Sequence, residues 1–207
     1  PYKFEISGSG LAVADYPELK FIRSEHKKTT HLWGADEPCF GISVFPDYNE
    51  RLVYIYGTRL EGKIHRCYIS RVPFDQITDI SKYEYLISQQ PEWSRKRTKI
   101  IPVLNGMPTE MSVSYNDYLD CYLAVYSREK TNDIEACTAP TPWGPWSEPT
   151  VVHTVKTGLR NPLVYDGPNV YAGKEHPELA LESGKIIYIT YVEFEEYFPH
   201  LVEVVLE

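Results

Sequence analysis

The strongest constraint on the fold is a pattern of alternating apolar and polar residues that returns three times along the chain. It is clearest in three tyrosine-rich stretches, "RLVYIYGTR", "DCYLAVYSRE" and "GKIIYITYVE". A period of two residues predicts β-strands, and strands favour Tyr, Val and Ile. Each stretch lies between two further alternating segments, separated from them by turns rich in Asp, Asn or Gly. The chain is therefore predicted to be all-β.

The spacing of these units predicts the architecture. Taking Gly41, Glu110 and His176 as equivalent positions gives repeats of about 69 and 66 residues. Four antiparallel strands in so long a repeat are typical of a β-propeller blade with generous loops. We expect one propeller domain over residues 1–207, divided into the outer strands of a preceding blade (1–37) and three blades (38–105, 106–170 and 171–207).

Charge and hydropathy exclude several kinds of partner. The net charge of the 207 residues is −8, and the one basic cluster, between Arg95 and Lys99, is small enough to be a solvated loop. Nucleic acids and anionic membranes need a basic footprint, so neither is an expected partner. No apolar run approaches the roughly 18 residues of a membrane-spanning helix. The first residues carry no basic and apolar leader, so any export signal would lie outside this sequence.

The cysteines do not form a metal-binding pattern. Cys39, Cys67, Cys121 and Cys137 are scattered without a CxxC pair or a Cys/His cluster, so no zinc site is expected. Free buried thiols are the simpler interpretation. A disulfide stays open for one pair, because Cys121 and Cys137 would fall nearly opposite each other in a hairpin that turns near Asn132.

The segment "TPWGPWSEP" is predicted to be a corner between the third and fourth strands of the second repeat. Its Pro and Gly residues suit a sharp reversal of the chain. Trp143 and Trp146 can cover a blade edge that would otherwise expose unpaired backbone, and we favour this role over a sugar-stacking one.

The ordered series of motifs resembles a known family. "VYIYGTR", "ISRVPFDQITDISKYEYL" followed by Trp93, "WGPWSEP" and "YAGKEHPELALESGKIIYITYVE" together look like the five-bladed β-propellers related to glycoside hydrolases. The resemblance extends to uncharacterised propeller domains similar to endo-D-arabinanases and, more distantly, to the arabinanase and β-xylosidase clan. It implies a central funnel whose acidic residues act on a glycan.

The resemblance also implies that part of the ring is missing. Five blades of this period need more residues than 207, so the chain resembles the C-terminal part of such a propeller. Another copy or another chain could complete the ring. In the resembled enzymes an essential acid comes from an early blade, which this sequence does not contain. A role on glycans points to an extracellular or periplasmic location.

Acidic residues at the starts of the innermost strands are the candidate catalytic groups. Glycoside hydrolysis needs one carboxyl with a raised pKa and a second carboxylate as base or nucleophile. Glu110 precedes an apolar strand where desolvation would raise its pKa, which makes it the preferred acid. Asp36, Glu37 and Glu175 are its candidate partners, and Asp36 is also a candidate substrate-binding residue.

Candidate binding residues surround these acids. His176 precedes Pro177 in an extended segment, and Glu178 would be the next inward-facing residue. His176 could bind a sugar hydroxyl, tune Glu110 or hold a metal ion or water in the channel, or it could be a hydrogen-bonded histidine of the core. No other cofactor is expected.

Aromatic and basic side chains complete the candidate site. Tyr171, Tyr197 and Trp33 could stack on sugar rings, although most of the 17 tyrosines must be ordinary strand residues. Arg59 and Arg128 occupy matching places after the second strand of successive repeats. They could bind an acidic sugar or hold carboxylates, although a structural role is the simpler interpretation.

Two functions remain in competition at this point. The preferred one is a glycoside hydrolase-like propeller that cleaves a poly- or oligosaccharide by carboxylate acid/base chemistry. The alternative is a non-catalytic propeller module, or a fragment of one, that binds a carbohydrate or a protein. Fold does not decide between them, and neither the sugar nor the retaining or inverting outcome follows from the sequence.

Overall fold

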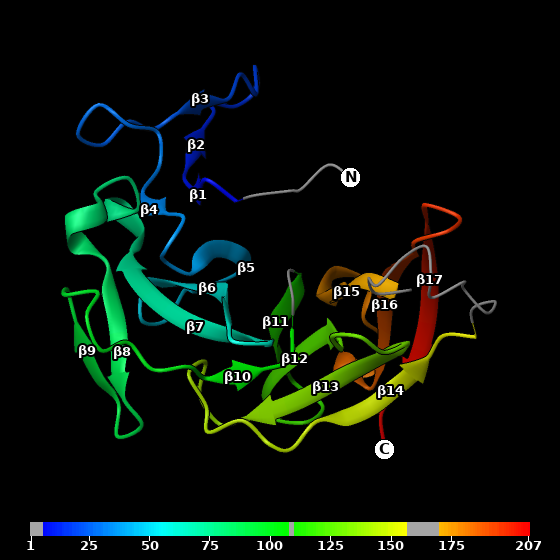
Figure 1. Ribbon diagram of the computed structural model, residues 1–207. Helices are drawn as coiled ribbons and strands as arrows, with labels where there is room; N and C mark the ends of the chain where they lie inside the picture. Colours follow the sequence, from blue (N-terminus) through cyan, green and yellow to red (C-terminus); the bar gives the residue numbers. More distant parts are fainter. Residues whose placement is uncertain (1–5, 108–109, 157–169) are drawn as a thin grey trace. The chain divides into compact units, whose positions relative to one another are not determined.

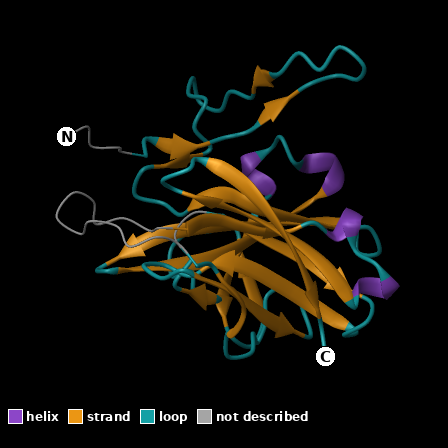
Figure 2. Cartoon of the chain, turned by 90° about the vertical axis from the view of Figure 1, so that its right-hand side faces the viewer, coloured by secondary structure: helices purple, strands orange, loops and turns teal. Residues whose placement is uncertain are grey.

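The protein is built of β-strands. The computed structural model describes residues 6–107, 110–156 and 170–207. Figure 2 shows strands through most of this part of the chain. Its helices are short 3₁₀ turns at Phe74–Gln76, Ile80–Lys82, Pro177–Leu179 and Glu182–Gly184. Within the described ranges there is no α-helix, and no helix long and apolar enough to cross a membrane. The all-β prediction is confirmed.

The chain divides into two compact units. The first comprises Pro1–Arg59 and Cys67–Pro102, and the second comprises Leu60–Arg66 and Val103–Glu207. The strands Leu52–Glu61 and Ile64–Pro73 form a long hairpin. Its turn, residues 60–66, belongs to the second unit, while the rest of both strands belongs to the first. The units are described separately below.

One large sheet dominates the first unit (Figure 1). Its strands follow one another in sequence order: β5 (Cys39–Asp47), β6 (Leu52–Glu61), β7 (Ile64–Pro73), β8 (Glu84–Ser88) and β9 (Glu92–Ser94). A short strand, β10 (Leu104–Asn105), also pairs with β7. Before this sheet the chain forms two antiparallel pairs, β1 (Gly8–Ser9) with β4 (Trp33–Gly34) and β2 (Ala12–Val13) with β3 (Ile22–Arg23).

Two sheets form the second unit. The four antiparallel strands of the first are β11 (Met111–Asn116), β12 (Cys121–Ser127), β13 (Asp133–Ala139) and β14 (Thr150–Thr154). The three of the second are β15 (Val170–Glu175), β16 (Ile186–Glu193) and β17 (Phe198–Val205). The predicted order of short strand, tyrosine-rich strand and third strand is confirmed in the first two repeats, whereas in the third the first strand lies earlier than predicted, at Val170–Glu175.

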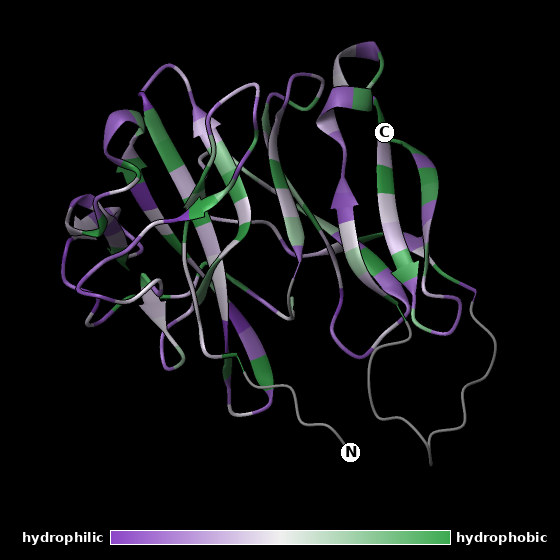
Figure 3. Cartoon of the chain, turned by 90° about the horizontal axis from the view of Figure 1, so that it is seen from above, coloured by the Kyte–Doolittle hydropathy of each residue, from purple (hydrophilic) through white to green (hydrophobic). Residues whose placement is uncertain are grey.

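Each unit has a core formed by the alternation of side chains along its strands. Figure 3 shows apolar and polar bands following one another along many strands. In the second unit the buried side chains include Leu123 and Val125 of β12, Ile134 of β13, and Ile187 and Ile189 of β16. Residues two apart on a strand point to the same face, so each strand contributes one row of side chains to this core.

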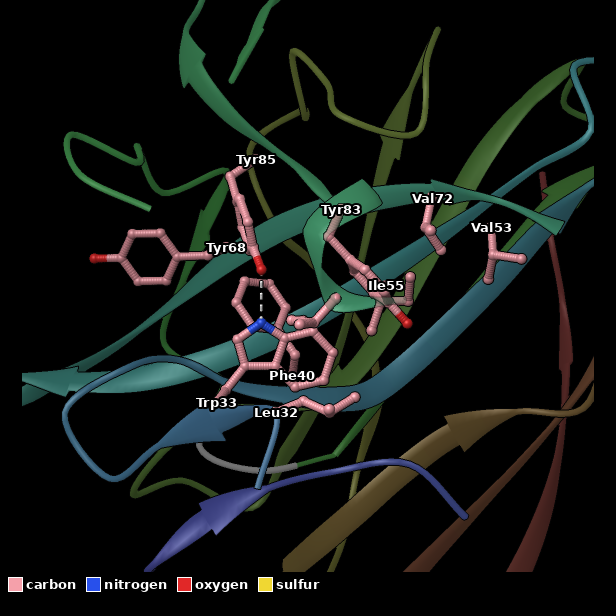
Figure 4. Packing of buried hydrophobic residues seen from close by; sticks show 10 residues of the cluster. Leu32, Trp33, Phe40, Val53, Ile55, Tyr68, Val72, Tyr83 and Tyr85 are labelled. Carbon is pink, nitrogen blue, oxygen red and sulfur yellow. Dashed lines mark hydrogen bonds between the residues drawn. The ribbon is translucent and has the colours of Figure 1, made fainter. Parts of the chain in front are cut away.

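The core of the first unit is aromatic (Figure 4). Trp33 packs against Phe40 and Tyr83, with ring centroids 5.1 and 5.3 Å apart. Its indole Nε1 donates a hydrogen bond of 2.8 Å to the hydroxyl of Tyr85, which is also buried. Trp33 is only 4% exposed, so the suggestion that it stacks on sugars is wrong.

Of the two interpretations left open for Cys121 and Cys137, free thiols are confirmed and the disulfide is wrong. In the β12–β13 hairpin Cys137 lies opposite Ala124, while Cys121 lies opposite Asn116 of β11. A shift of a few residues in register separates two positions that a symmetric hairpin would have brought together. All four cysteines, which lie in the described part of the chain, are free thiols.

The "TPWGPWSEP" corner lies where the sequence predicts it, between the end of β13 at Ala139 and the start of β14 at Thr150. Its turn is closed by the N–H of Gly144, which donates to the carbonyl of Thr141 at 3.0 Å. Gly144 has φ of +104°, a conformation that glycine adopts without strain.

The buried bond between Trp33 and Tyr85 gives a test of the first core. Tyr85→Phe keeps the ring but leaves the indole N–H of Trp33 buried without its acceptor. We expect the free energy of unfolding to fall by about 1–3 kcal/mol. Urea denaturation measures the change, with Tyr48→Phe as the matched control because Tyr48 is 77% exposed. Equal stability of the two variants would contradict the assignment.

Candidate functional site

Glu37 and Asp36 lie in the first unit, just before β5. The carboxylate of Glu37 accepts hydrogen bonds from Nη1 of Arg97 at 2.7 and 2.8 Å and from the N–H of Gly34 at 2.8 Å. Arg97 also donates to the carbonyl of Leu32 at 3.1 Å. Both oxygens of Glu37 are thus engaged by structural donors, and part of the basic cluster serves as an anchor for this turn.

Arg59 belongs to the same unit and has structural contacts. Its guanidinium donates to the carbonyl of Asp36 at 3.3 Å and to the hydroxyl of Tyr68 at 3.2 Å. It also lies over the ring of Tyr68, with Cζ 5.1 Å from the centroid. Arg59 therefore ties the end of β6 to β7 and to the preceding turn, while Asp36 itself is exposed.

In the second unit, Glu110 and Glu175 are both connected to β11. Glu110 directly precedes this strand and is half-buried. Glu175 ends β15, and its backbone N–H donates to Oγ of Ser112 at 2.8 Å. The hydroxyl of Ser114 donates to Oε2 of Glu175 at 2.6 Å. Positions 112 and 114 share the face of β11 that contacts Glu175, and Glu110 is the residue immediately before this strand.

Glu175 is the buried acid of this unit. Only 5% of the surface of this residue is exposed. Burial raises the pKa of this carboxyl, and the charge of Glu178 raises it further, while the bond from Ser114 and the proximity of His176 partly oppose the shift. A carboxyl with a raised pKa can keep its proton at a pH where an ordinary glutamate has lost it. This is the property that the sequence analysis expected of Glu110.

A glycine brings β15 close enough for these bonds. The N–H of Gly173 donates to Oγ of Ser127 at 2.9 Å. A Cβ at this position would lie 2.7 Å from that oxygen and 2.8 Å from the Ser127 nitrogen, closer than real Cβ contacts allow. The pairing of β15 with β16 also shifts register between Tyr171 and Lys174. The absent side chain and the shifted register together place the end of β15 against β11.

His176 and Glu178 lie beyond the end of the strand. β15 stops at Glu175, and residues 177–179 form a 3₁₀ turn, so the prediction that Glu178 is the next inward-facing strand residue is wrong. Proline after His176 removes a backbone donor and turns the chain. Glu178 is 67% exposed, and its Oε1 lies 3.0 Å from Nδ1 of His176. Nε2 of His176 lies 2.8 Å from Oγ1 of Thr190. Both ring nitrogens are thus hydrogen-bonded within the protein.

A small pocket opens beside Glu175. Its volume is about 180 Å³, and its lining includes Glu175, Asn116, Pro177 and Gly184. Buried Asn116 shapes it, because its Nδ2 donates to the carbonyl of Gly184 at 2.8 Å and its Oδ1 accepts from the N–H of Leu119 at 2.9 Å. We call Glu175 with Ser112, Ser114, His176, Glu178 and Thr190 the Glu175 cluster.

The predicted aromatic residues divide between surface and core. Tyr171 of β15 and Tyr197 of the β16–β17 turn are near each other, with ring centroids 6.5 Å apart. Tyr197 is 76% exposed and accessible to a ligand. Their use in binding stays a prediction.

Arg128 holds a carboxylate, one of the two roles considered for it. Its Nη1 donates to Oε1 of Glu135 at 2.5 Å, and this bond is the largest cause of the raised pKa of Arg128. Arg128 and Glu135 line a second pocket, of about 660 Å³, together with Trp146. The tryptophan that was assigned only to covering a blade edge therefore lines a cavity.

No metal-ligand group around His176 is found among the described residues. Across residues 6–107, 110–156 and 170–207, no three His, Cys, Asp or Glu side chains form a group that could hold a metal ion.

Several residues of the Glu175 cluster were missed by the sequence analysis. Ser112 and Ser114 alternate with apolar residues in "EMSVSYN", and small polar side chains repeated on one face of a strand could have indicated a buried polar partner. Thr190 carried no such signal, because it contacts His176 only through the pairing of β15 with β16.

The fold and this cluster define an all-β protein of successive antiparallel sheets with a buried acidic group. Comparison with family models is more specific, since residues 15–203 match the domain of unknown function DUF4185. The chain belongs to this family.

Two known proteins are similar to the chain. Notoamide biosynthesis cluster protein J' from Aspergillus versicolor is 29% identical over 127 residues, which are 54% of this chain and 35% of that protein. The crystal structure of a presumed hydrolase from Bacteroides ovatus ATCC 8483 superimposes with a TM-score of 0.55 and 16% identity, covering 80% of this chain and 44% of that one. The chain thus spans less than half the length of either relative.

The raised pKa of Glu175 predicts how stability depends on pH. The folded chain keeps this proton to higher pH than the unfolded chain, whose carboxyl has the ordinary pKa of 4.5. Ionisation therefore lowers the free energy of unfolding as the pH rises above 4.5, until the raised pKa is passed. We expect Glu175→Gln to gain stability relative to the natural chain over this interval, as measured by urea denaturation in a pH series.

Glu178→Gln is a control variant for which the expected change in stability has the opposite sign. Hydrogen bonds from its own backbone N–H and from His176 lower the pKa of Glu178, so its ionised form favours the folded state. The Gln variant should lose stability at neutral pH, and the difference should vanish as the pH falls through the lowered pKa. A pH-independent difference for Glu175→Gln would refute burial as the cause of its shift.

Proposed function

We propose that this chain is part of a five-bladed β-propeller of the glycoside hydrolase type, which cleaves a poly- or oligosaccharide. The successive antiparallel sheets support the propeller interpretation, because consecutive sheets of about four strands are what propeller blades require. In this proposal residues 1–37 belong to the outer strands of one blade, and the blades 38–105, 106–170 and 171–207 follow. Another segment or chain completes the ring.

The observation that carries the proposal is the state of Glu175. A glycosidase needs a carboxyl group that is protonated at working pH, so that it can donate a proton to the leaving oxygen. Burial raises the pKa of Glu175 in this direction, and a pocket opens beside it. We therefore assign the acid to Glu175, and we assign the base or nucleophile to Glu110, immediately before β11.

The remaining candidates take secondary roles. Both ring nitrogens of His176 are engaged, by Glu178 and by Thr190, so we give His176 the role of holding the edge of the cluster rather than of binding a sugar hydroxyl directly. Tyr171 and Tyr197 offer ring faces for a sugar. Glu37, Asp36 and Arg59 have structural contacts in the first unit, and we give them no catalytic step. The hydrolase description of the B. ovatus protein agrees with the reaction class.

The substrate class and location follow from the same proposal. The chain would meet its glycan outside the cytoplasm, in the periplasm or the extracellular space. The alternative of a non-catalytic binding module predicts that a glycan binds to the same residues without being cleaved.

The test is hydrolysis of arabinan and xylan oligosaccharides, followed by the release of reducing ends. Glu175→Gln should lower kcat by about 100- to 10,000-fold with little change in KM, because it removes proton donation in the transition state. Glu110→Gln should lower kcat similarly, whereas Glu92→Gln, at an exposed position of β9, should have no effect. Full turnover by Glu175→Gln would overturn the assignment. Binding without turnover by the natural chain would favour the binding module.

A further inference from the structure

The larger pocket of the second unit lies among elements that come from distant parts of the sequence. Its volume, about 660 Å³, is within the range of about 300–1,000 Å³ that ligand pockets occupy. The turn of the β6–β7 hairpin, β10, the β12–β13 hairpin and the "TPWGPWSEP" corner all contribute to it. The lining residues used below are Lys63, Tyr126, Arg128, Lys130, Glu135 and Trp146. None of its lining residues belongs to the Glu175 cluster.

The floor of this pocket is polar and held in place. Glu135 is 3% exposed, and its charge is compensated by the bond from Arg128. Tyr126 lies opposite Glu135 in the β12–β13 pairing and is fully buried. A paired and hydrogen-bonded carboxylate keeps its oxygens fixed, so it can accept hydrogen bonds from a ligand with little rearrangement.

A second set of bonds fixes one wall. Oε1 of Glu129 lies 2.9 Å from Nδ1 of His65, and its Oε2 accepts from the His65 N–H at 3.2 Å. The N–H of Glu129 donates to the carbonyl of Gly106 at 2.8 Å, and the N–H of Gly106 donates to the carbonyl of His65 at 2.8 Å. These bonds join the hairpin turn at residues 60–66 to the β12–β13 turn, so the pocket is preformed.

Trp146 provides an apolar surface. The residue is half-buried, while its Nε1 atom is fully buried and has no hydrogen-bond partner among the described residues. The part of the indole that remains accessible is therefore carbon. The negative face of an aromatic ring attracts the weakly positive C–H groups of a sugar ring, which makes this surface suitable for stacking.

Two lysines lie on the rim, although the charges of the whole lining cancel, since Lys63, Arg128 and Lys130 balance Glu129, Glu135 and Glu148. Lys63 and Lys130 are exposed, and neither ammonium group forms an ion pair within the described chain. Glu129 and Glu135 are engaged by His65 and Arg128, which leaves Glu148 as the other charged group on the rim. Two lysines at the mouth of a pocket attract an anionic group, even though the whole chain has a net charge of −8.

We propose that this pocket binds an acidic saccharide, in which a hexuronate ring stacks on Trp146 and its carboxylate lies between Lys63 and Lys130. The hydroxyl groups of the sugar donate to the carboxylate floor at Glu135. A phosphate group offers this floor mainly acceptor oxygens, whereas a hexuronate ring offers several neutral hydroxyl donors, so we take the saccharide as the occupant and a nucleotide as the competing outcome of the test. The pocket acts in binding alone and does not depend on hydrolysis at Glu175.

Calorimetric titration of the 207-residue chain with trigalacturonate tests the proposal, with the methyl-esterified trimer as the uncharged probe. The acid should bind at least about tenfold more tightly than the ester, because only the acid can form charge-assisted bonds with the lysines. The double variant K63A/K130A should abolish this difference. Trp146→Phe, which keeps a ring, should weaken both ligands while the chain stays folded.

The matched control is K96A/K99A, which removes two exposed lysines from the first unit. Lys99 and Lys130 both have positive φ, 69° and 63°, so the two double variants impose the same kind of backbone change. The control should bind trigalacturonate like the natural chain. Equal affinity for acid and ester, unchanged binding by K63A/K130A, tighter binding of ATP than of trigalacturonate, or the absence of binding would each overturn the proposal.

Discussion

The close packing of β15 against β12 is the constraint on which the second unit depends. Gly173 meets Ser127 at a distance that leaves no room for a Cβ, and a backbone bond to the Ser127 hydroxyl fixes the contact. Successive side chains of a strand point to opposite faces. Ser127 therefore faces β15, whereas Tyr126 and Arg128 on either side of it line the larger pocket. One strand end thus positions the Glu175 cluster on one face and the proposed saccharide pocket on the other.

The strands were predictable because their signal is local. Alternation in "RLVYIYGTR" or "GKIIYITYVE" depends on neighbouring residues, and the turns between strands are marked by Asp, Asn and Gly. Register is different, because it depends on how two strands slide against each other. Cys121 and Cys137 show the limit: the hairpin that contains them is present, but its register separates the two thiols.

For the candidate site, as for the strands, local features could be predicted from the sequence and long-range partners could not. Comparison of the starts of the predicted innermost strands identified Glu175, although the structure places this residue at the end of β15. The polar alternation in "EMSVSYN" could indicate that Ser112 and Ser114 have a buried partner, but not that this partner is Glu175, because the separations in the two hydrogen bonds are 61 and 63 residues. The same difficulty affected Glu37. Its partner Arg97 lies 60 residues later, and nothing in the local sequence indicates that this arginine occupies the carboxylate.

The two buried glutamates of the second unit, Glu135 and Glu175, differ in how the charge of the carboxylate is compensated. Glu135 is bonded to a guanidinium, which offsets the cost of removing its charge from water. Glu175 has no Lys or Arg ion pair within the described residues, and its carboxyl accepts a hydrogen bond from a hydroxyl group. An uncompensated carboxyl in such a place costs stability whenever it ionises, and an apolar side chain would avoid this cost. The stability cost of an uncompensated carboxyl beside a pocket is therefore the reason for which we propose, rather than observe, a proton-transfer role for Glu175.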